Sequence, residues 1–286
     1  MKSFIRALGR EAESRAAALA TNRGGGTATL YFGGGTPSML SDTHLGHLME
    51  TLDRLVPVDK LDEFSFEANP ATFTEKKVRF WRSLGMTRVS LGVQSLDSGI
   101  LHLLGREHTP AQALHSVEML KNAGMPHINM DLMFAIPGQT LSIWEATLKE
   151  AVRAGTDHIS AYNLTYEEDT EFFRSLLRGE KRQDPDEDAA FFELAEHMLE
   201  AAGLRHYETS NYAREGCISP HNMAYWKGED YVGIGPGAVS TINGIRYSNT
   251  RDTDAYIRST LENGLPLSEQ EPVTEEDYRL ERIALM

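Results

Sequence analysis

A chain of 286 residues with 41% hydrophobic and 24% charged residues has the composition of an ordinary globular protein with a sizeable core. Its formal net charge of −14 argues against non-specific binding to nucleic acid and against binding to anionic membrane surfaces. No apolar stretch approaches the length of a membrane span, the charged N-terminal segment does not resemble a secretory signal, and the single cysteine, Cys217, excludes a disulfide framework, so a cytoplasmic location is the default expectation.

The first predicted element is an amphipathic helix over residues 3–20, followed by Gly24–Gly26. Thr29–Phe32 comes next, and its apolar, β-favouring residues predict a buried strand. This strand opens into Gly33–Pro37, which contains three consecutive glycines. Because glycine lacks a Cβ atom, backbone N–H groups in such a loop can approach a ligand closely, although a tight turn would need the same glycines. Both interpretations stay open at this point.

The rest of the chain alternates between helices and strands. Helices are predicted at about 41–55, 74–84, 96–104, 110–124, 140–155 and 185–203, and strands at about 63–66, 87–93, 127–133, 158–164 and 205–210. Thr109 and Thr140 are candidate N-cap residues, and several of the helices end at a glycine. Such alternation over roughly 200 residues predicts a parallel sheet, either a barrel or a doubly wound sheet. The glycine loop lacks the GxGxxG fingerprint of a dinucleotide fold, which favours a barrel, complete or incomplete.

Polar residues stand where the predicted strands end, the position that carries the ligand site in parallel barrels. They are Thr36, Glu67, Gln94, Asp131 and Asn163, with Arg106 and His108 after the strand that ends at Gln94. A carboxylate or amide at such a position is costly to bury without a partner. Each side chain alone could cap a helix or tie down a loop, but the set together predicts a shared site.

The chemistry of this set indicates what the ligand contains. Glu67 can accept hydrogen bonds from ribose hydroxyls or from an ammonium group, and Gln94 offers both a donor and an acceptor. Arg106 can pair with a carboxylate, and the main chain of the glycine loop can meet an amino-acid head group. Together these groups match a ligand that has an amino-acid end and a nucleoside.

Six segments, in order along the chain, resemble the radical S-adenosylmethionine (SAM) family. They are Tyr31–Ser38, Phe66–Pro70, Arg88–Ser95, Gly105–Thr109, Ile128–Leu132 and Ala135–Thr140. Within that family the chain looks like the branch of oxygen-independent coproporphyrinogen dehydrogenase and the HemW-type heme chaperones. Ala161–Glu168 and His221–Trp226 point to the chaperones, since the second segment is similar to the HNxxYW motif of that subgroup.

The resemblance implies an α/β fold, a partial (β/α)6 TIM-like barrel. Residues 1–175 are expected to form the barrel part, and residues 176–286 a smaller C-terminal region that completes the barrel and begins an accessory region. The fold implied here lacks its first strand, which leaves an open edge beside the strand at 28–32.

The resemblance also implies the site residues. SAM is expected to contact Gly34, Gly35 and Thr36 through its methionine end, with its pocket completed by Glu67, Gln94, Arg106 and Asp131. The segment implicated in heme handling matches His221, Asn222, Tyr225 and Trp226. From the residues alone, His221 is either an axial heme ligand or a loop histidine, and the two aromatic residues either stack on a porphyrin or pack in the core.

One departure from the family is large. The family's 4Fe-4S cluster is held by a CxxxCxxC motif just after the first barrel strand, and a cluster of this kind needs three protein thiolates. This chain has one cysteine, Cys217, so it holds no set of cluster ligands, and no protein metal site is expected. Cys217 itself is either a redox or metal-binding thiol or a plain loop residue. We interpret the chain as truncated at both ends.

Three functional hypotheses follow from the resemblance. The first is a heme chaperone that binds SAM and heme and delivers heme to acceptor proteins, without nucleic acid or an integral membrane segment. The second is a radical SAM coproporphyrinogen dehydrogenase, an enzyme. The third is an inactive fragment with a stable partial barrel. The segment His221–Trp226 favours the chaperone, so whether the chain is an enzyme stays open.

Overall fold

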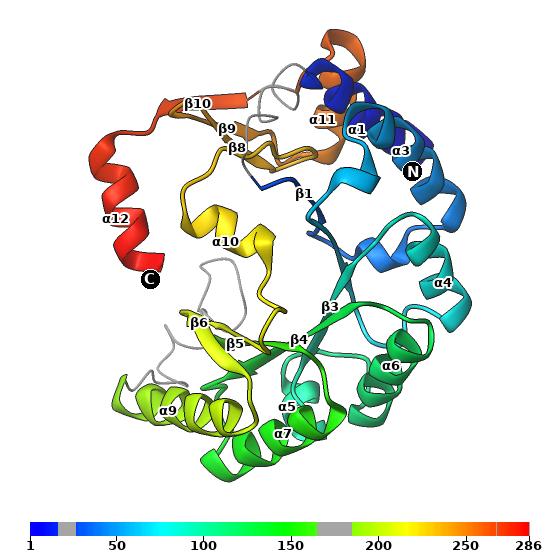
Figure 1. Cartoon of the computed structure of the whole chain (residues 1–286). Helices are drawn as coiled ribbons and strands as arrows, with labels where there is room; N and C mark the ends of the chain where they lie inside the picture. The colour runs from blue at the N-terminus through cyan, green and yellow to red at the C-terminus, as the bar shows by residue number, and fades with distance from the viewer. Residues whose placement is uncertain (17–26, 165–184, 267, 286) are drawn as a thin grey trace.

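The computed structural model describes residues 1–16, 27–164, 185–266 and 268–285, and it has an α/β fold built on a curved seven-stranded sheet (Figure 1). The strands lie in the order β1 (Thr29–Phe32), β2 (Glu63–Ala68), β3 (Arg88–Gln94), β4 (His127–Phe134), β5 (His158–Asn163), β7 (Asn211–Ala213) and β6 (Arg205–Glu208). Neighbours from β1 to β5 are parallel, as the alternation of helices and strands predicts. The sheet does not close on itself within the described part of the chain, so the expected incomplete barrel is confirmed.

β1 is an edge strand, and its paired neighbour in the described sheet is β2. The open edge expected beside this segment is therefore confirmed, whereas the expectation of a buried strand is wrong. Tyr31 exposes 37% of its surface, and the other three residues of β1 are half-buried. An edge strand is covered on one side only, so apolar, β-favouring residues do not by themselves guarantee burial.

Helices cover the outer side of the parallel strands (Figure 1). They are α3 (Asp42–Leu55), α4 (Glu75–Ser83), α6 (Pro110–Asn122), α7 (Leu141–Ala154) and α9 (Pro185–Ala201), with a short α5 (Ser98–Leu103) after β3 and the 3-10 turn η3 (Val58–Lys60) before β2. The predicted caps are in place, because Thr109 forms a capping box with Gln112 and the Thr140 hydroxyl accepts the Ile143 N–H at 3.3 Å. Among the described helices, none combines the length and the hydrophobicity that a bilayer crossing requires.

Alternate residues of the parallel strands face opposite sides of the sheet. One set is apolar and packs in the core with the helices: Phe64, Phe66, Val89, Leu91, Met130, Leu132, Ile159 and Ala161. The other set is mainly polar: Glu63, Ser65, Glu67, Arg88, Ser90, Asn129, Asp131, His158, Ser160 and Tyr162. Members of this second set bond to one another across the strands, so the inner side of the curve, called the lumen below, is a hydrogen-bonded polar layer.

The single strand expected at residues 205–210 is instead a hairpin of β6 and β7. β7 pairs antiparallel with His158–Ser160 of β5, so the run of parallel strands ends at β5. The helix–strand alternation predicted one more parallel strand here. The chain reverses between Glu208 and Asn211, and the returning strand takes the place beside β5.

A second sheet and four helices complete the described chain. They are β8 (Val239–Ile242), β9 (Ile245–Asn249), β10 (Ser268–Pro272), α1 (Lys2–Ser14), α10 (Pro220–Trp226), α11 (Thr253–Asn263) and α12 (Glu275–Leu285). The N-terminal helix α1, predicted from its periodicity, packs against both α3 and α11. Its buried Glu11 accepts hydrogen bonds from Tyr256 at 2.7 Å and from Asn249 at 2.8 Å, which ties the second sheet to the start of the chain.

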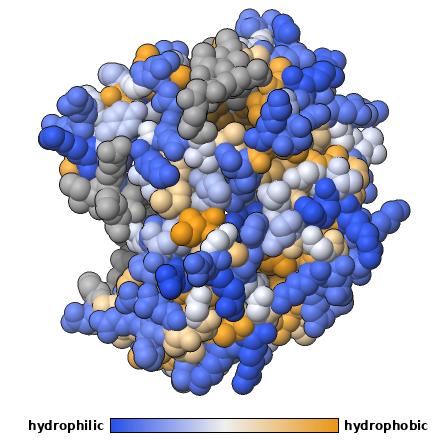
Figure 2. All heavy atoms as spheres, in the orientation of Figure 1, coloured by the Kyte–Doolittle hydropathy of each residue, from blue (hydrophilic) through white to orange (hydrophobic). Residues whose placement is uncertain are grey.

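Some expectations fall outside the described residues. They concern Gly24–Gly26, Asp184, the end of the segment Ala161–Glu168, and the boundary between residues 175 and 176. The face of the molecule seen in Figure 1 is drawn again with all its atoms in Figure 2. It is mainly hydrophilic at its margin, and apolar residues gather near its centre.

Candidate functional site

The glycine loop follows β1 and leads into the 3-10 turn η2 (Pro37–Met39). Gly34 and Gly35 have φ angles of +75° and +58°, and a Cβ atom built on either would meet nothing within 4 Å. Such backbone angles favour glycine, and the open space beside these residues leaves room for a ligand. A Cβ atom on Gly33 would instead lie 2.4 Å from the ring of Tyr31, so glycine there lets Tyr31 fold back across the loop.

Glu67, at the end of β2, lies directly against this loop. Its Oε2 atom accepts the Gly34 N–H at 3.0 Å, and its Oε1 atom accepts the Tyr31 hydroxyl at 2.6 Å. Although the residue as a whole is partly exposed, desolvation of its hydroxyl, together with the charge of Glu67, raises the pKa of Tyr31 well above its usual range, so the tyrosine is a permanent donor to the carboxylate. The loop and the carboxylate therefore form one unit in which a ligand's hydroxyl or ammonium donors would compete with Tyr31.

Asp131 lies on β4 in register with Gly92 of β3 and Ser160 of β5. It accepts hydrogen bonds from the Ser90 hydroxyl at 2.8 Å and the Asn129 amide at 2.7 Å. Burial raises the pKa of Asp131 to about 6, and the nearby negative charge of Glu67 raises it further while the hydrogen bonds oppose the shift. The two carboxylates thus face a common space in the lumen.

Arg106 and Gln94 complete the expected set. Burial lowers the pKa of Arg106 and the charge of Asp131 opposes that change, so the guanidinium and this carboxylate are close enough to interact. Gln94 ends β3 at a φ of +67°, and its amide nitrogen would lie 3.1 Å from a Cβ atom on Gly92. Its side chain therefore folds back over the strand, where an alanine in place of Gly92 would displace it.

Thr36 joins the same end of the sheet through Asn69, whose amide donates to the Thr36 hydroxyl at 3.4 Å. The structure thus brings the loop and the ends of β2, β3 and β4 together. Two other strand-end candidates have local roles instead. Asn163 donates to Asp188 of α9 at 3.1 Å, and His108 contacts the Val93 carbonyl at 3.1 Å.

The lumen contains polar residues that the search for strand ends missed. Asn129 donates its amide hydrogens toward Ser90, Asp131 and Ser160, and its Oδ1 atom lies 2.7 Å from Nδ1 of His158. Burial lowers the pKa of His158 to about 3, so the imidazole is neutral. The alternation of polar and apolar residues within the strands is the sequence signal that could have identified this layer.

At the amino ends of the strands, the lumen is closed by a buried ion pair. Arg88 donates from Nε to Glu63 at 2.6 Å, and the other oxygen of Glu63 accepts the Ser219 hydroxyl at 2.8 Å. Arg88 also donates to the Cys217 carbonyl at 2.9 Å. Since Ser219 is the N-cap of α10, this pair fixes where that helix begins.

Helix α10 places the four residues of the expected heme segment beside β1 and the lumen. His221 lies 2.8 Å from the Thr29 hydroxyl through Nδ1, and its ring stacks on Tyr31 with centroids 4.7 Å apart. The edge of Tyr225 meets the same imidazole at 5.1 Å. Burial lowers the pKa of His221, which keeps the ring neutral.

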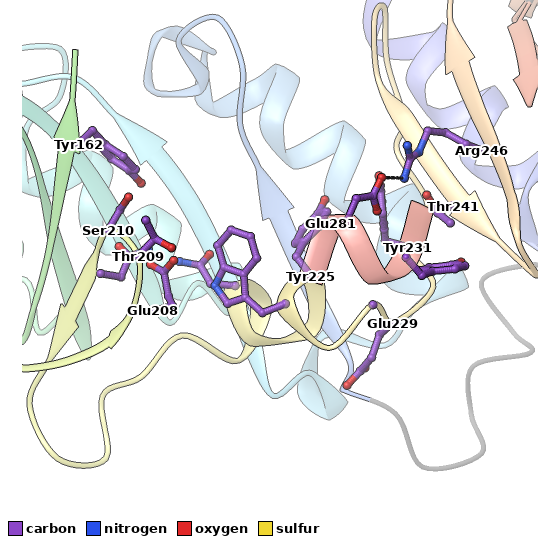
Figure 3. A pocket seen from close by; sticks show the side chains of 15 residues that line it. Tyr162, Glu208, Thr209, Ser210, Tyr225, Glu229, Tyr231, Thr241, Arg246 and Glu281 are labelled. Atoms are coloured by element: carbon purple, nitrogen blue, oxygen red, sulfur yellow. Dashed lines mark hydrogen bonds and ion pairs between the residues drawn. The ribbon is translucent and has the colours of Figure 1, made fainter. Parts of the chain in front are cut away.

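A cavity of about 670 Å³ lies between α10, the β6–β7 turn and the second sheet. Figure 3 shows Tyr162, Glu208, Thr209 and Ser210 on one side of it, and Tyr225, Tyr231, Thr241, Arg246 and Glu281 on the other. Asn222, Tyr225 and Trp226 line this cavity, whereas His221 is not among its lining residues. Arg246 is the cation among the described lining residues, and it is paired with Glu281 at 2.7 Å and with Glu271 at 3.9 Å. Three of the four expected heme residues therefore share a cavity, and the fourth lies between that cavity and the glycine loop.

The residues present fit SAM but not an iron–sulfur cluster. Two carboxylates, a guanidinium and an open glycine loop suit a ligand with an amino-acid end and a nucleoside. A cluster would need several thiolates, and Cys217 lies near His127 and Asp157, which stand at the amino ends of β4 and β5, opposite the glycine loop. Burial and the charge of Asp157 raise the pKa of the Cys217 thiol, which favours the protonated form.

Comparison with known proteins gives consistent matches. Residues 9–151 match the radical SAM superfamily. The chain is 36% identical over 259 residues to the heme chaperone HemW of Bacillus subtilis, covering 90% of this chain and 68% of that protein. It is 34% identical to the heme chaperone HemW of Synechocystis, covering 90% of this chain and 63% of that protein. The chain therefore spans about two thirds of the length of these relatives.

Among solved structures, coproporphyrinogen III oxidase (HemN) from Escherichia coli superposes with a TM-score of 0.81 at 22% identity, covering 99% of this chain and 67% of that one. At this identity the match shows a shared fold, with its TIM-barrel-like sheet. The sequence matches show the family as well as the fold. The chain belongs to the radical SAM superfamily, and within it to the family of the HemW heme chaperones.

Proposed function

We propose that this chain carries the SAM-binding and heme-binding parts of a HemW-type heme chaperone, which delivers heme to acceptor proteins. The observation that carries the proposal is the position of α10: Asn222, Tyr225 and Trp226 line one cavity, and this cavity adjoins the lumen that holds Glu67 and Asp131. Relatives of the same family are named heme chaperones.

In this proposal SAM occupies the carboxyl ends of the parallel strands. The glycine loop at Gly34, Gly35 and Thr36 receives the methionine end of SAM, and Arg106 pairs with its carboxylate. Glu67 and Asp131 accept hydrogen bonds from ammonium and hydroxyl groups, and Gln94 supplies an amide donor and acceptor. The lumen residues are already oriented by hydrogen bonds within the chain, so little ordering is required when the ligand binds.

Heme is assigned to the cavity beside α10. The rings of Tyr225 and Trp226 offer apolar faces to a flat macrocycle, and Arg246 offers a cation for its carboxylates once Glu281 is displaced. His221 is neutral, as an axial ligand must be, but its Nδ1 atom faces Thr29, so ligation would use Nε2. Glu208, Glu229 and Glu281 also line the cavity, which disfavours a strongly anionic ligand bound deep inside it.

The iron–sulfur cluster of the family is not assigned to residues of this chain. With one cysteine, the chain is expected to show no broad absorbance near about 400 nm after anaerobic treatment with iron and sulfide, since thiolate-to-iron charge transfer needs several thiolates on the cluster. A stoichiometric cluster on this chain would contradict that assignment. The segment His221–Trp226, together with the sequence matches to heme chaperones, favours the chaperone over the alternative, a coproporphyrinogen dehydrogenase.

Titration with hemin, followed by its Soret absorbance, tests the heme assignment. His221→Ala is expected to weaken binding and change the spectrum, whereas the control His115→Ala, whose side chain is 66% exposed on α6, should leave both unchanged. An unchanged spectrum in His221→Ala would reject this histidine as ligand, and a chain that binds no hemin would reject the chaperone.

Calorimetric titration with SAM tests the lumen assignment. Glu67→Ala and Gln94→Ala are each expected to weaken SAM binding about tenfold or more, as the loss of one or two hydrogen bonds to charged or polar ligand groups implies. Equal affinity in the wild type and both variants would remove these residues from the pocket.

A further inference from the structure

Helix α10 touches the SAM pocket along two separate routes, although it belongs to the heme cavity. The first route runs over the surface of β1. The Tyr31 hydroxyl donates to Glu67 at 2.6 Å, and the Tyr31 ring stacks on His221 of α10 at 4.7 Å with the two planes 10° apart. His221 in turn meets Tyr225, a residue of the cavity wall, at 5.1 Å. One side chain thus contacts the pocket carboxylate at one end and the helix at the other.

The second route runs through the inside of the barrel as a chain of hydrogen bonds. The Asn222 side chain of α10 and the Ser219 backbone both act on the Tyr207 hydroxyl, opposing the rise in its pKa that burial causes, and the hydroxyl lies 2.8 Å from Nε2 of His158. Nδ1 of His158 lies 2.7 Å from Oδ1 of Asn129, whose amide nitrogen lies 2.7 Å from Asp131. This route joins the cavity wall to the second carboxylate of the SAM pocket.

The direction of these bonds follows from the groups themselves. The Asn129 amide nitrogen faces three acceptors, so its oxygen faces His158, and Nδ1 of the neutral imidazole must carry the hydrogen. Nε2 is then an acceptor, which makes Tyr207 a donor. The donors from Tyr207 through His158 and Asn129 to Asp131 therefore all point the same way, and bonds aligned in this manner strengthen one another.

We propose that these two routes couple the SAM pocket to the heme cavity, with Tyr31 and Tyr207 as the positioning residues that transmit the coupling. The inference rests on the proposed function. A ligand that donates a hydrogen bond to Glu67 competes with the Tyr31 hydroxyl for this carboxylate. A ligand that donates to Asp131 competes with the Asn129 amide, which can then donate to Ser90 or Ser160 instead. In the first case the ring that stacks on His221 changes its hydrogen bond, and in the second the change passes from Asn129 through His158 to Tyr207, which acts on Asn222. The arrangement of Asn222 and Tyr225 in the cavity therefore changes with SAM occupancy.

The first test is to follow SAM binding through Trp226, which lies on α10 and lines the cavity. The other tryptophans, Trp81 and Trp144, are fully buried outside it, and a Trp226→Phe variant supplies their emission for subtraction. SAM is expected to change the Trp226 emission of the wild type. The change should shrink in Tyr207→Phe and in Tyr31→Phe, and it should vanish in the double variant.

The second test measures the coupling itself. SAM is expected to change the Kd of hemin about fivefold, and hemin should change the Kd of SAM by the same factor, because linkage is reciprocal. In the double variant Tyr31→Phe/Tyr207→Phe the factor should fall to about 1. Tyr207→Phe is the more selective single variant, because Tyr31 also contacts Glu67 and its loss alters SAM binding directly.

Tyr212→Phe is the matched control. Tyr212 is fully buried on β7, next to β6, and its hydroxyl has no hydrogen-bond partner among the described residues. Removing that hydroxyl should leave both the Trp226 response and the coupling factor unchanged.

The outcomes separate this inference from the proposed function. If calorimetry shows SAM bound while Trp226 does not respond, or if the double variant couples like the wild type, the coupling is overturned and the two binding assignments stand. If hemin does not bind, the chaperone proposal fails, while the response of Trp226 to SAM still decides the link to α10. If SAM itself does not bind, both are overturned.

Discussion

The lumen and the cavity beside α10 are adjacent, but they differ in the elements that form them and in the polarity of their side chains. In the lumen, regular parallel strands set every second side chain in register, and the polar groups are bonded to one another before any ligand arrives. The cavity instead is walled by a seven-residue helix, a hairpin turn and the edge of a small antiparallel sheet, and tyrosine and tryptophan rings form much of its surface. The first arrangement suits a small polar ligand held in one pose, and the second suits a larger, flatter ligand that is bound and released.

Energetically the two regions should respond differently to substitution. A buried, hydrogen-bonded polar layer loses stability when one member is removed, since its partner stays buried without compensation. A cavity lined by aromatic residues loses ligand affinity with less effect on the fold. The predictions below use this difference.

The largest effect is expected from Arg88→Met, which leaves Glu63 buried without its cation. Both side chains are almost completely buried, so the free energy of unfolding should fall by about 3–5 kcal/mol in a urea titration. The control is Arg79→Ala, which removes an exposed i,i+4 pair with Glu75 and should cost no more than about 0.5 kcal/mol. An equal decrease in the free energy of unfolding in the two variants would show that the Arg88–Glu63 ion pair is not desolvated as its burial implies.

The next effect is the pH dependence contributed by Asp131. Its pKa is raised in the folded state from 3.8 to about 6, so the folded protein binds this proton more tightly than the unfolded chain. Stability from this group is therefore present at low pH and is lost as the pH rises through about 6. Relative to Asp131→Asn, the wild type should lose about 2 kcal/mol of unfolding free energy between about pH 4 and pH 7.

Urea titrations of the wild type and Asp131→Asn at several pH values check this expectation. The difference between the two proteins, rather than either curve alone, isolates the group from other carboxylates. A difference that does not vary with pH would mean that the carboxyl is solvated rather than part of the buried layer.

A smaller effect is expected from Trp226→Leu in the cavity. Loss of the indole should weaken hemin binding by about tenfold, the order of magnitude for one aromatic contact, while the Kd of SAM alone stays within about twofold. Hemin and SAM titrations of the same variant measure both quantities. Phe4→Leu removes a ring that packs on Tyr256, and since neither residue lines the cavity, both affinities should stay unchanged.

The smallest effect serves as a baseline outside both regions. Thr140→Ala removes the N-cap of α7 on the outer side of the sheet and should lower the free energy of unfolding by about 1 kcal/mol. Neither ligand affinity should change, since Thr140 is part of neither site. A change in SAM affinity in this variant would show that the helices outside the sheet help to hold the lumen in shape.

Much of the barrel, and the gathering of the proposed SAM-binding residues at one end of it, could be predicted from local patterns. The caps at Thr109 and Thr140 bond to residues three positions away, and the consecutive glycines indicate a loop with positive φ angles. Both features can therefore be predicted from residues that are neighbours in the sequence. Parallel strands joined by helices have their carboxyl ends at the same edge of the sheet. For this reason the sequence predicts that Glu67 and Asp131 lie close together.

The second region could not be found in this way. Residues 205–210 are predicted as one strand, but the chain turns within them, and the direction of β7 is set by its antiparallel pairing with β5. Nothing near Tyr31 indicates that its ring stacks on His221, and Thr29 meets that histidine across 192 residues of chain.

The sequence by itself therefore determined the periodic elements, their ends, the run of parallel strands and the residues at their carboxyl ends, because spacing and capping act over a few residues. The tertiary structure alone decided which of those residues share hydrogen bonds, that His221 stacks on Tyr31 and does not line the cavity, and that the N-cap of α10 bonds to Glu63. Those contacts depend on the curvature of the sheet. This curvature results from the packing of all the strands and helices together, so no short segment of the sequence determines it.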